Sequence, residues 1–167
     1  MISSSDSENS MISTTAATKR LARAIAVSDG EFSLLLACCN SVKNQQQILN
    51  LLTEFSSTGI QEILLSPDAQ TLYTTITTTI GTTQPEALMV RGLESVVEIN
   101  QLISSANLMR NEFRKQFHFP LILWVNDEIL RKLVWLAPDL KDWAACTIRF
   151  DALSNQLMES EQQAISA

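Results

Sequence analysis

Continuous apolar runs of strand length recur along this chain. The two clearest are Phe32–Cys39 and Phe119–Val125, and each is far shorter than the roughly 20 residues of a membrane-spanning helix. A strand that is apolar at nearly every position must be covered on both faces, which is typical of parallel sheets packed between helices. Ile60–Leu65, Ala87–Arg91 and Trp143–Phe150 have a similar character, so the sequence predicts five strands.

The segments between these runs follow the spacing of amphipathic helices. Apolar residues recur at three- and four-residue intervals from about residue 48 to Phe55, and a longer helix is expected behind Glu94, with one apolar face as far as Phe113. Asn126 is expected to cap a further helix, which Pro138 ends.

The threonine-rich segment 72–80 is ambiguous, because threonine favours strands while its apolar residues keep helical spacing. We predict a helix that begins at Ser66-Pro67-Asp68, where an N-cap, a proline and a first-turn acid come together.

Strand and helix therefore alternate five times, which predicts an α/β fold with a three-layer, doubly wound, mostly parallel five-stranded sheet. Residues 14–151 are expected to form a single domain with an N-terminal adapter helix. Residues 1–13 are polar and are predicted to be a disordered tail. Residues 152–167 are predicted to be a C-terminal helix or a linker to a possible downstream domain.

Composition narrows the class of partner. Of the 167 residues, 46% are hydrophobic, and 12 basic against 18 acidic residues leave a net charge of −6. This balance argues against nucleic acid and anionic membranes as partners. No secretory signal is recognisable, so a cytoplasmic location is expected. The three cysteines do not make a disulfide framework.

In a doubly wound sheet, ligands bind beyond the carboxyl ends of the strands. The loop after the first strand lacks the glycines that let backbone amides surround a phosphate, and its single Lys43 stands outside a Walker A pattern. A structural turn is therefore favoured over a nucleotide site at this loop.

The strand Ala87–Arg91 is predicted to lie at the centre of the sheet. A magnesium-holding acid would normally end such a strand, but Arg91 and Gly92 stand there, and Glu94 follows at the start of a helix. Glu94 is interpreted as a first-turn acid that complements the helix dipole. Arg91 could pair with Glu94, or bind an anion or a partner carboxylate.

We predict no catalytic residues and no metal ligands. His118 is the only histidine and lies before a strand without a nucleophile elbow. Cys38 and Cys39 should point to opposite faces of one strand, and with Cys146 they lack metal-ligand spacing.

Three tryptophans fall in the C-terminal third: Trp124, Trp135 and Trp143. Core packing, with each indole N–H finding a partner, is the favoured interpretation. The alternative is an aromatic docking surface for another domain, with Trp135, Asp139 and Trp143 as the candidate interaction residues.

Several stretches resemble a known family. They are Phe119–Leu133, Ala137–Trp143 and Thr147–Phe150, together with the shorter matches Leu36–Asn40 and Gly92–Ser95. They resemble the N-terminal ATPase-like domain of bacterial, often cyanobacterial, multidomain proteins that continue into tetratricopeptide repeats or related signalling modules. The resemblance covers about residues 20 to 150.

The resemblance implies a P-loop-NTPase-like sheet without Walker A, in which strands one, three and four correspond to the Walker A, Walker B and sensor strands. It also implies a regulatory or protein-interaction role in a signalling or scaffold protein. We therefore expect a non-catalytic module with protein partners, or downstream domains of the same polypeptide, and no cofactor.

Two alternatives stay open. One is an atypical nucleotide-binding or NTP-hydrolysing enzyme, with an ATP–Mg²⁺ site built on Lys43, Arg91 and Glu94. The other is a stand-alone homo-oligomerising protein.

Overall fold

The computed structural model describes residues 4–150, with side chains described from residue 14 onward. Five parallel strands form one sheet in the order β2-β3-β4-β1-β5. The strands are β1 (Ser33–Cys38), β2 (Ile60–Leu64), β3 (Ala87–Arg91), β4 (Pro120–Val125) and β5 (Ala144–Arg149). The helices are α1 (Ser4–Val27), α2 (Val42–Phe55), α3 (Leu72–Ile80), the 3-10 turn η1 (Leu93–Ser95), α4 (Ile99–Leu108), α5 (Arg110–Gln116), α6 (Asp127–Leu136) and α7 (Pro138–Asp142).

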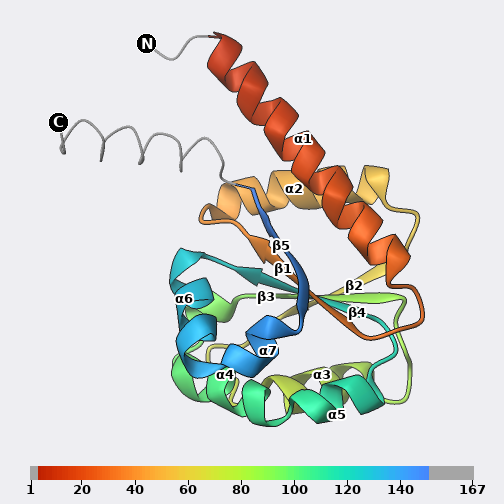
Figure 1. Cartoon of the computed structure of the whole chain (residues 1–167), viewed down its shortest axis with the longest axis vertical. Coiled ribbons are helices and arrows are strands. Elements are labelled where there is room, and N and C mark those ends of the chain that lie inside the picture. The colour runs from red at the N-terminus through yellow and green to blue at the C-terminus, as the bar shows by residue number, and fades with distance from the viewer. Residues whose placement is uncertain (1–3, 151–167) are drawn as a thin grey trace, which may run out of the picture.

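The helices cover both faces of the sheet, with α1 and α2 on one side and α3 to α7 on the other (Figure 1). The reason lies in the direction of the crossovers. From β1 the chain crosses toward the β2 edge, and every later crossover runs back toward the β5 edge. Right-handed crossovers that run in opposite directions place their helices on opposite faces. The predicted three-layer, doubly wound, P-loop-NTPase-like fold without Walker A is confirmed.

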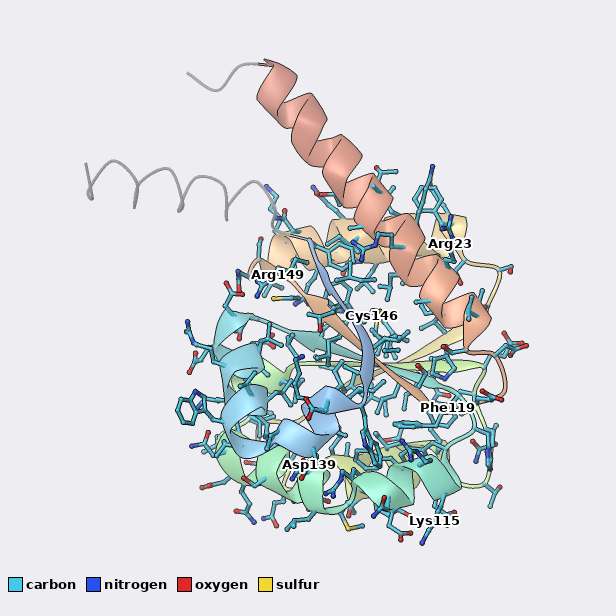
Figure 2. All side chains as sticks on the ribbon, viewed as in Figure 1. Arg23, Lys115, Phe119, Asp139, Cys146 and Arg149 are labelled. Atoms are coloured by element: carbon cyan, nitrogen blue, oxygen red, sulfur yellow. The ribbon has the colours of Figure 1, made fainter. Side chains whose placement is uncertain are left out.

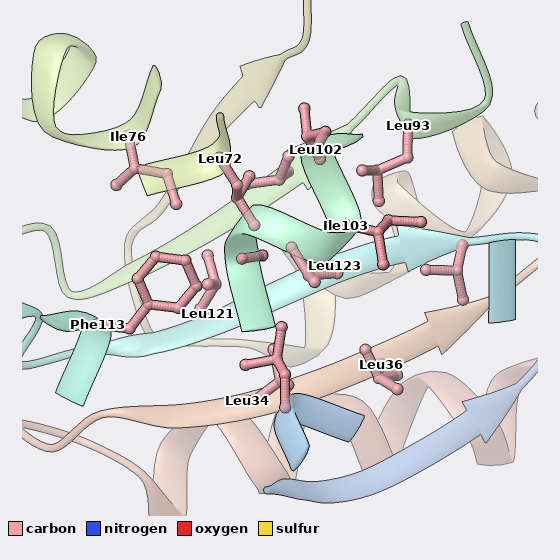
Figure 3. Packing of buried hydrophobic residues seen from close by; sticks show 14 of the residues in the cluster. Leu34, Leu36, Leu72, Ile76, Leu93, Leu102, Ile103, Phe113, Leu121 and Leu123 are labelled. Atoms are coloured by element: carbon pink, nitrogen blue, oxygen red, sulfur yellow. The ribbon is translucent and has the colours of Figure 1, made fainter. Parts of the chain in front are cut away.

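Each face of the sheet has its own apolar core, because successive strand residues point to opposite sides. The larger core joins β1, β3 and β4 to α3 through α7, and Figure 3 shows leucines of β1 and β4 packed against α3, α4 and Phe113. The smaller core lies beneath α1 and α2. Cys38 belongs to the first core and Cys39 to the second, as predicted.

All five predicted strands are present, and β3 has the predicted bounds. The centre of the sheet, however, is β4, so the prediction that Ala87–Arg91 lies at the centre is wrong. The chain returns from β4 to β5 on the far side of β1, which leaves β3 next to the edge strand β2.

The threonine-rich segment is a helix, as predicted, but the predicted start at residues 66–68 is wrong. Helix α3 begins at Leu72, and the Thr71 hydroxyl caps it by accepting from the Thr74 amide at 3.3 Å. Residues 66–68 form a turn instead, in which the Ser66 hydroxyl accepts from the Asp68 amide at 3.3 Å.

The single long helix predicted behind Glu94 is wrong, because the segment divides into η1, α4 and α5. At the first break, the amide of Val97 donates to the carbonyl of Pro67 at 3.0 Å instead of to a helical carbonyl. At the second break, the Arg110 guanidinium donates to the carbonyl of Asn107 at 2.7 Å. Both interruptions are compensated by hydrogen bonds outside the regular helical pattern.

Helix α1 begins at Ser4, earlier than the Thr14 boundary predicted from the sequence, since extending an existing helix adds one hydrogen bond per residue without a new nucleation cost. Pro138, which was expected to end the preceding helix, also begins the short helix α7. The predicted C-terminal helix or linker, 152–167, lies outside the described residues. No helix within residues 4–150 has the length and apolar character to cross a membrane.

Candidate functional site

The topology defines one position for a ligand at the carboxyl edge of the sheet. Strands β1 and β4 are neighbours, but the chain leaves β1 toward α2 on one face and leaves β4 toward α6 on the other. Such a switch point opens a crevice between the two outgoing loops, where α/β sheets bind their ligands. The side chains that follow β1 and β4 therefore decide what this site can do.

Two of these side chains bridge the crevice. The Asn40 side chain accepts a hydrogen bond from the Asp127 backbone amide at 2.9 Å and donates one to the Asp127 carboxylate, also at 2.9 Å. The neighbouring Asn126 caps α6 by accepting from the Ile129 amide at 2.8 Å, as predicted. The two loops at the switch point are thus joined directly to each other.

A third strand joins this contact through Arg149 at the end of β5. Its guanidinium donates to the Asp127 carboxylate at 2.7 Å and lies 3.8 Å from the sulfur of Cys38. The Cys38 thiol in turn lies 3.5 Å from the same carboxylate. We call Cys38, Asn40, Asp127 and Arg149 the switch-point cluster. Figure 2 shows Arg149 where β5 ends.

The cluster holds Asp127 in its charged form. The hydrogen bond from Arg149 is the main cause that lowers the Asp127 pKa below its usual value of 3.8, with further hydrogen bonds from Asn40 and Cys38, while partial burial opposes the shift. A carboxylate with a lowered pKa is a poor general base at neutral pH, because it binds a proton weakly. The arrangement therefore favours a structural role for Asp127 over proton transfer.

The three candidate nucleotide-binding residues lie on three different elements. Lys43 is exposed in the first turn of α2, and Glu94 is exposed in η1, which leads to the opposite face. Arg91 is paired with Glu62, at 3.7 Å between Nη1 and Oε1, and not with Glu94. Within residues 14–150, no recorded ion pair or hydrogen bond joins Lys43, Arg91 and Glu94.

Two of the three candidate interaction residues are engaged within the domain. Asp139 forms an ion pair with Arg110, at 3.8 Å between Nη2 and Oδ2. Trp143 packs beneath Arg114, whose guanidinium carbon lies 3.9 Å from the ring centre. These contacts hold α7 and the start of β5 against α4 and α5.

The other two tryptophans, Trp124 and Trp135, differ in their burial. Trp124 is fully buried, but its indole nitrogen has no hydrogen-bond partner among the described residues, so the expectation that each indole N–H finds a partner is wrong for Trp124. Trp135 is 82% exposed on α6, beside Val134, which is 52% exposed. Trp135 is therefore available to another molecule, whereas Asp139 and Trp143 already have partners in the domain.

Sequence reasoning singled out the loop after the first strand and the helix cap at Asn126, but it did not bring Asn40 and Asp127 together. Arg149 was missed altogether. Its signal was weak, since a basic residue at the end of an edge strand is usually solvated. The contact becomes visible only when the strand order brings β5 beside β1.

Comparisons with protein-family models, with curated proteins and with solved structures find no match to this chain. The fold and the geometry of the sheet edge therefore carry the functional argument.

Proposed function

We propose that this chain is a non-catalytic protein-interaction module, a degenerate NTPase-like domain of a signalling or scaffold protein. The observation that carries the proposal is the switch-point cluster, in which Asn40, Asp127 and Arg149 bond to one another across the crevice where such folds bind ligands.

The loop after β1 supports this proposal. A phosphate site needs several backbone amides free to point at the anion. Here the Asn44 amide donates to the Ser41 hydroxyl at 3.3 Å, and the Gln45 amide donates to the Ser41 carbonyl at 3.0 Å. The Arg149 guanidinium of the switch-point cluster is already paired with the ionised Asp127 at 2.7 Å and is therefore less available to a phosphate.

The exposed surface of α6 supports the interaction role. Tryptophan is enriched among the residues that anchor protein interfaces, and the consecutive residues Val134 and Trp135 both expose apolar area on α6. Arg131 precedes Trp135 by one helical turn and is also exposed, so a partner surface that combines apolar and acidic groups would complement this side of α6.

The resemblance noted in the sequence leads us to propose further that the module is bacterial, acts in the cytoplasm and continues into tetratricopeptide repeats. Its partners would be proteins or downstream domains of the same polypeptide, without nucleic acid or membrane. Extending the open reading frame beyond Ala167 tests this part directly, because a stop codon there would contradict a downstream domain.

Titration calorimetry with ATP and Mg²⁺ tests the loss of the nucleotide site. The proposal predicts no saturable heat and no phosphate release. A magnesium-dependent site of micromolar affinity would overturn it and would support the atypical enzyme instead. Light scattering tests the remaining alternative, a stand-alone homo-oligomerising protein. A stable dimer that dissociates in the variant Trp135→Ala would support this alternative.

A further inference from the structure

A polar groove lies away from the switch point, between α2 and the strands β2 and β3. Its volume is about 270 Å³. Helix α2 contributes Gln46, Asn50 and Thr53, which are neutral hydrogen-bonding side chains spaced along one side of the helix. The strands contribute one anion, Glu62, and one cation, Arg91.

Arg91 has unused hydrogen-bonding capacity. Its side chain is only 21% exposed, yet its Nε is buried without a hydrogen-bond partner among the described residues. Its Nη1 lies 3.7 Å from Glu62, an ion pair that is too long for a hydrogen bond. Because Nε is buried, the part of the guanidinium left for a ligand is the end formed by Nη1 and Nη2, which matches a carboxylate that accepts two parallel hydrogen bonds.

Glu62 supplies the negative charge that a ligand's ammonium group would need. It lies on the edge strand β2, and its side chain is 48% exposed, so it is free to rotate toward an added positive group. A ligand whose carboxylate reaches Arg91 would leave Glu62 beside it to accept from an ammonium. Opposite charges a few ångströms apart are the signature of an α-amino acid in its zwitterionic form.

We propose that this groove binds a free α-amino acid with a neutral polar side chain. Its carboxylate would pair with Arg91, its ammonium with Glu62, and its side chain with the carboxamides and hydroxyl of α2. The volume fits a molecule smaller than the drug-sized ligands that fill about 300–1,000 Å³. This site is independent of the protein-interaction role and would make the module responsive to a metabolite.

L-glutamine is the probe that matches the lining, and calorimetry or ¹⁵N NMR on the full chain measures its binding. With ten heavy atoms at ordinary ligand efficiency, the expected dissociation constant is about 1–10 mM. Propionate and propylamine carry half of the zwitterion each and should bind at least about tenfold more weakly. Equal binding of propionate, or no saturation with glutamine, overturns the proposal.

Two variants locate the site. Arg91→Gln and Glu62→Gln should each weaken glutamine binding by about tenfold or more, because each removes one charge-assisted contact. Glu62 is on an exposed edge, so Glu62→Gln is expected to fold even if Arg91→Gln does not. Arg23→Gln changes an exposed arginine of α1 and is the matched control. Binding that survives Glu62→Gln unchanged would place the ligand elsewhere and refute the assignment.

Discussion

Replacing Asp127 by alanine should destabilise the fold by about 2 kcal/mol. Of this, about 1 kcal/mol comes from the lost hydrogen bond with Asn40. The ion pair with Arg149 adds at most about 1 kcal/mol, since the two side chains are 36% and 47% exposed and solvent screens them. Loss of an acid in the first turn of α6 contributes about 0.5 kcal/mol.

Urea unfolding followed by tryptophan fluorescence measures this change, with Asp68→Ala as the matched control. Asp68 is an exposed acid in the loop after β2 and forms no ion pair with another residue in the described part of the chain. Its replacement should change the unfolding free energy by less than about 0.5 kcal/mol. If the two variants unfold at the same urea concentration, the switch-point cluster does not hold the three strand ends together.

The difference in unfolding free energy between the natural chain and Asp127→Ala should depend on pH in a defined direction. The folded-state pKa of Asp127 is below its usual value of 3.8, so the stability it contributes is fully present above that value. It is lost as the pH falls through the lowered folded-state pKa. The difference between the natural chain and Asp127→Ala should therefore shrink below about pH 4 and stay constant between pH 5 and 8. A difference that grows on acidification would contradict the lowered pKa.

Three further predictions concern other parts of the fold. Gly92→Ala should lower the free energy of unfolding by more than about 1 kcal/mol, because Gly92 has a φ of 89° and an added Cβ would lie 3.0 Å from Leu64 Cδ1. Gly30→Ala is the control in the same urea assay, since Gly30 has a φ of 77° but lies in open space, so this variant measures the backbone cost alone. Trp124→Ala should lower the free energy of unfolding by about 3–5 kcal/mol and Trp135→Ala by less than about 0.5 kcal/mol, since Trp124 is buried and Trp135 is exposed. Similar shifts in melting temperature for the two variants would refute this contrast. Burial raises the pKa of the Cys146 thiol, so its reaction with an aromatic disulfide reagent should be slow at pH 7 and accelerate up to and beyond pH 9, which a flat pH profile would contradict.

The sheet was predictable because its signals are local. Ala87–Arg91 is apolar except at its last residue and is bounded by Pro85 and Gly92, so both ends of β3 could be placed from sequence. The apolar run ending at Val125 and the cap at Asn126 placed β4 and α6 in the same way. The order of the strands has no such local signal, which is why β3 was predicted at the centre.

The helix breaks and the candidate site depend on contacts between distant residues. The Arg110 guanidinium donates to the Asn107 carbonyl in α4, and the Asn107 side chain accepts from the Leu140 amide at 2.9 Å. The break after Leu108 therefore reflects packing against α7 and not a local helix-breaking residue. Likewise, Asn40 and Asp127 are far apart in the chain and meet only because β1 and β4 are neighbours. Sequence periodicity contains no information about such pairs.

The most direct test of the central claim is an NMR titration of the full chain with ATP and Mg²⁺. It follows the side-chain amide of Asn40 and the backbone amide of Asp127, which are the groups that bond across the switch point. A closed, non-catalytic switch point predicts that neither resonance shifts in a saturable manner. Saturable, magnesium-dependent shifts of both resonances at micromolar ATP would show that the crevice opens to nucleotide and would contradict the account.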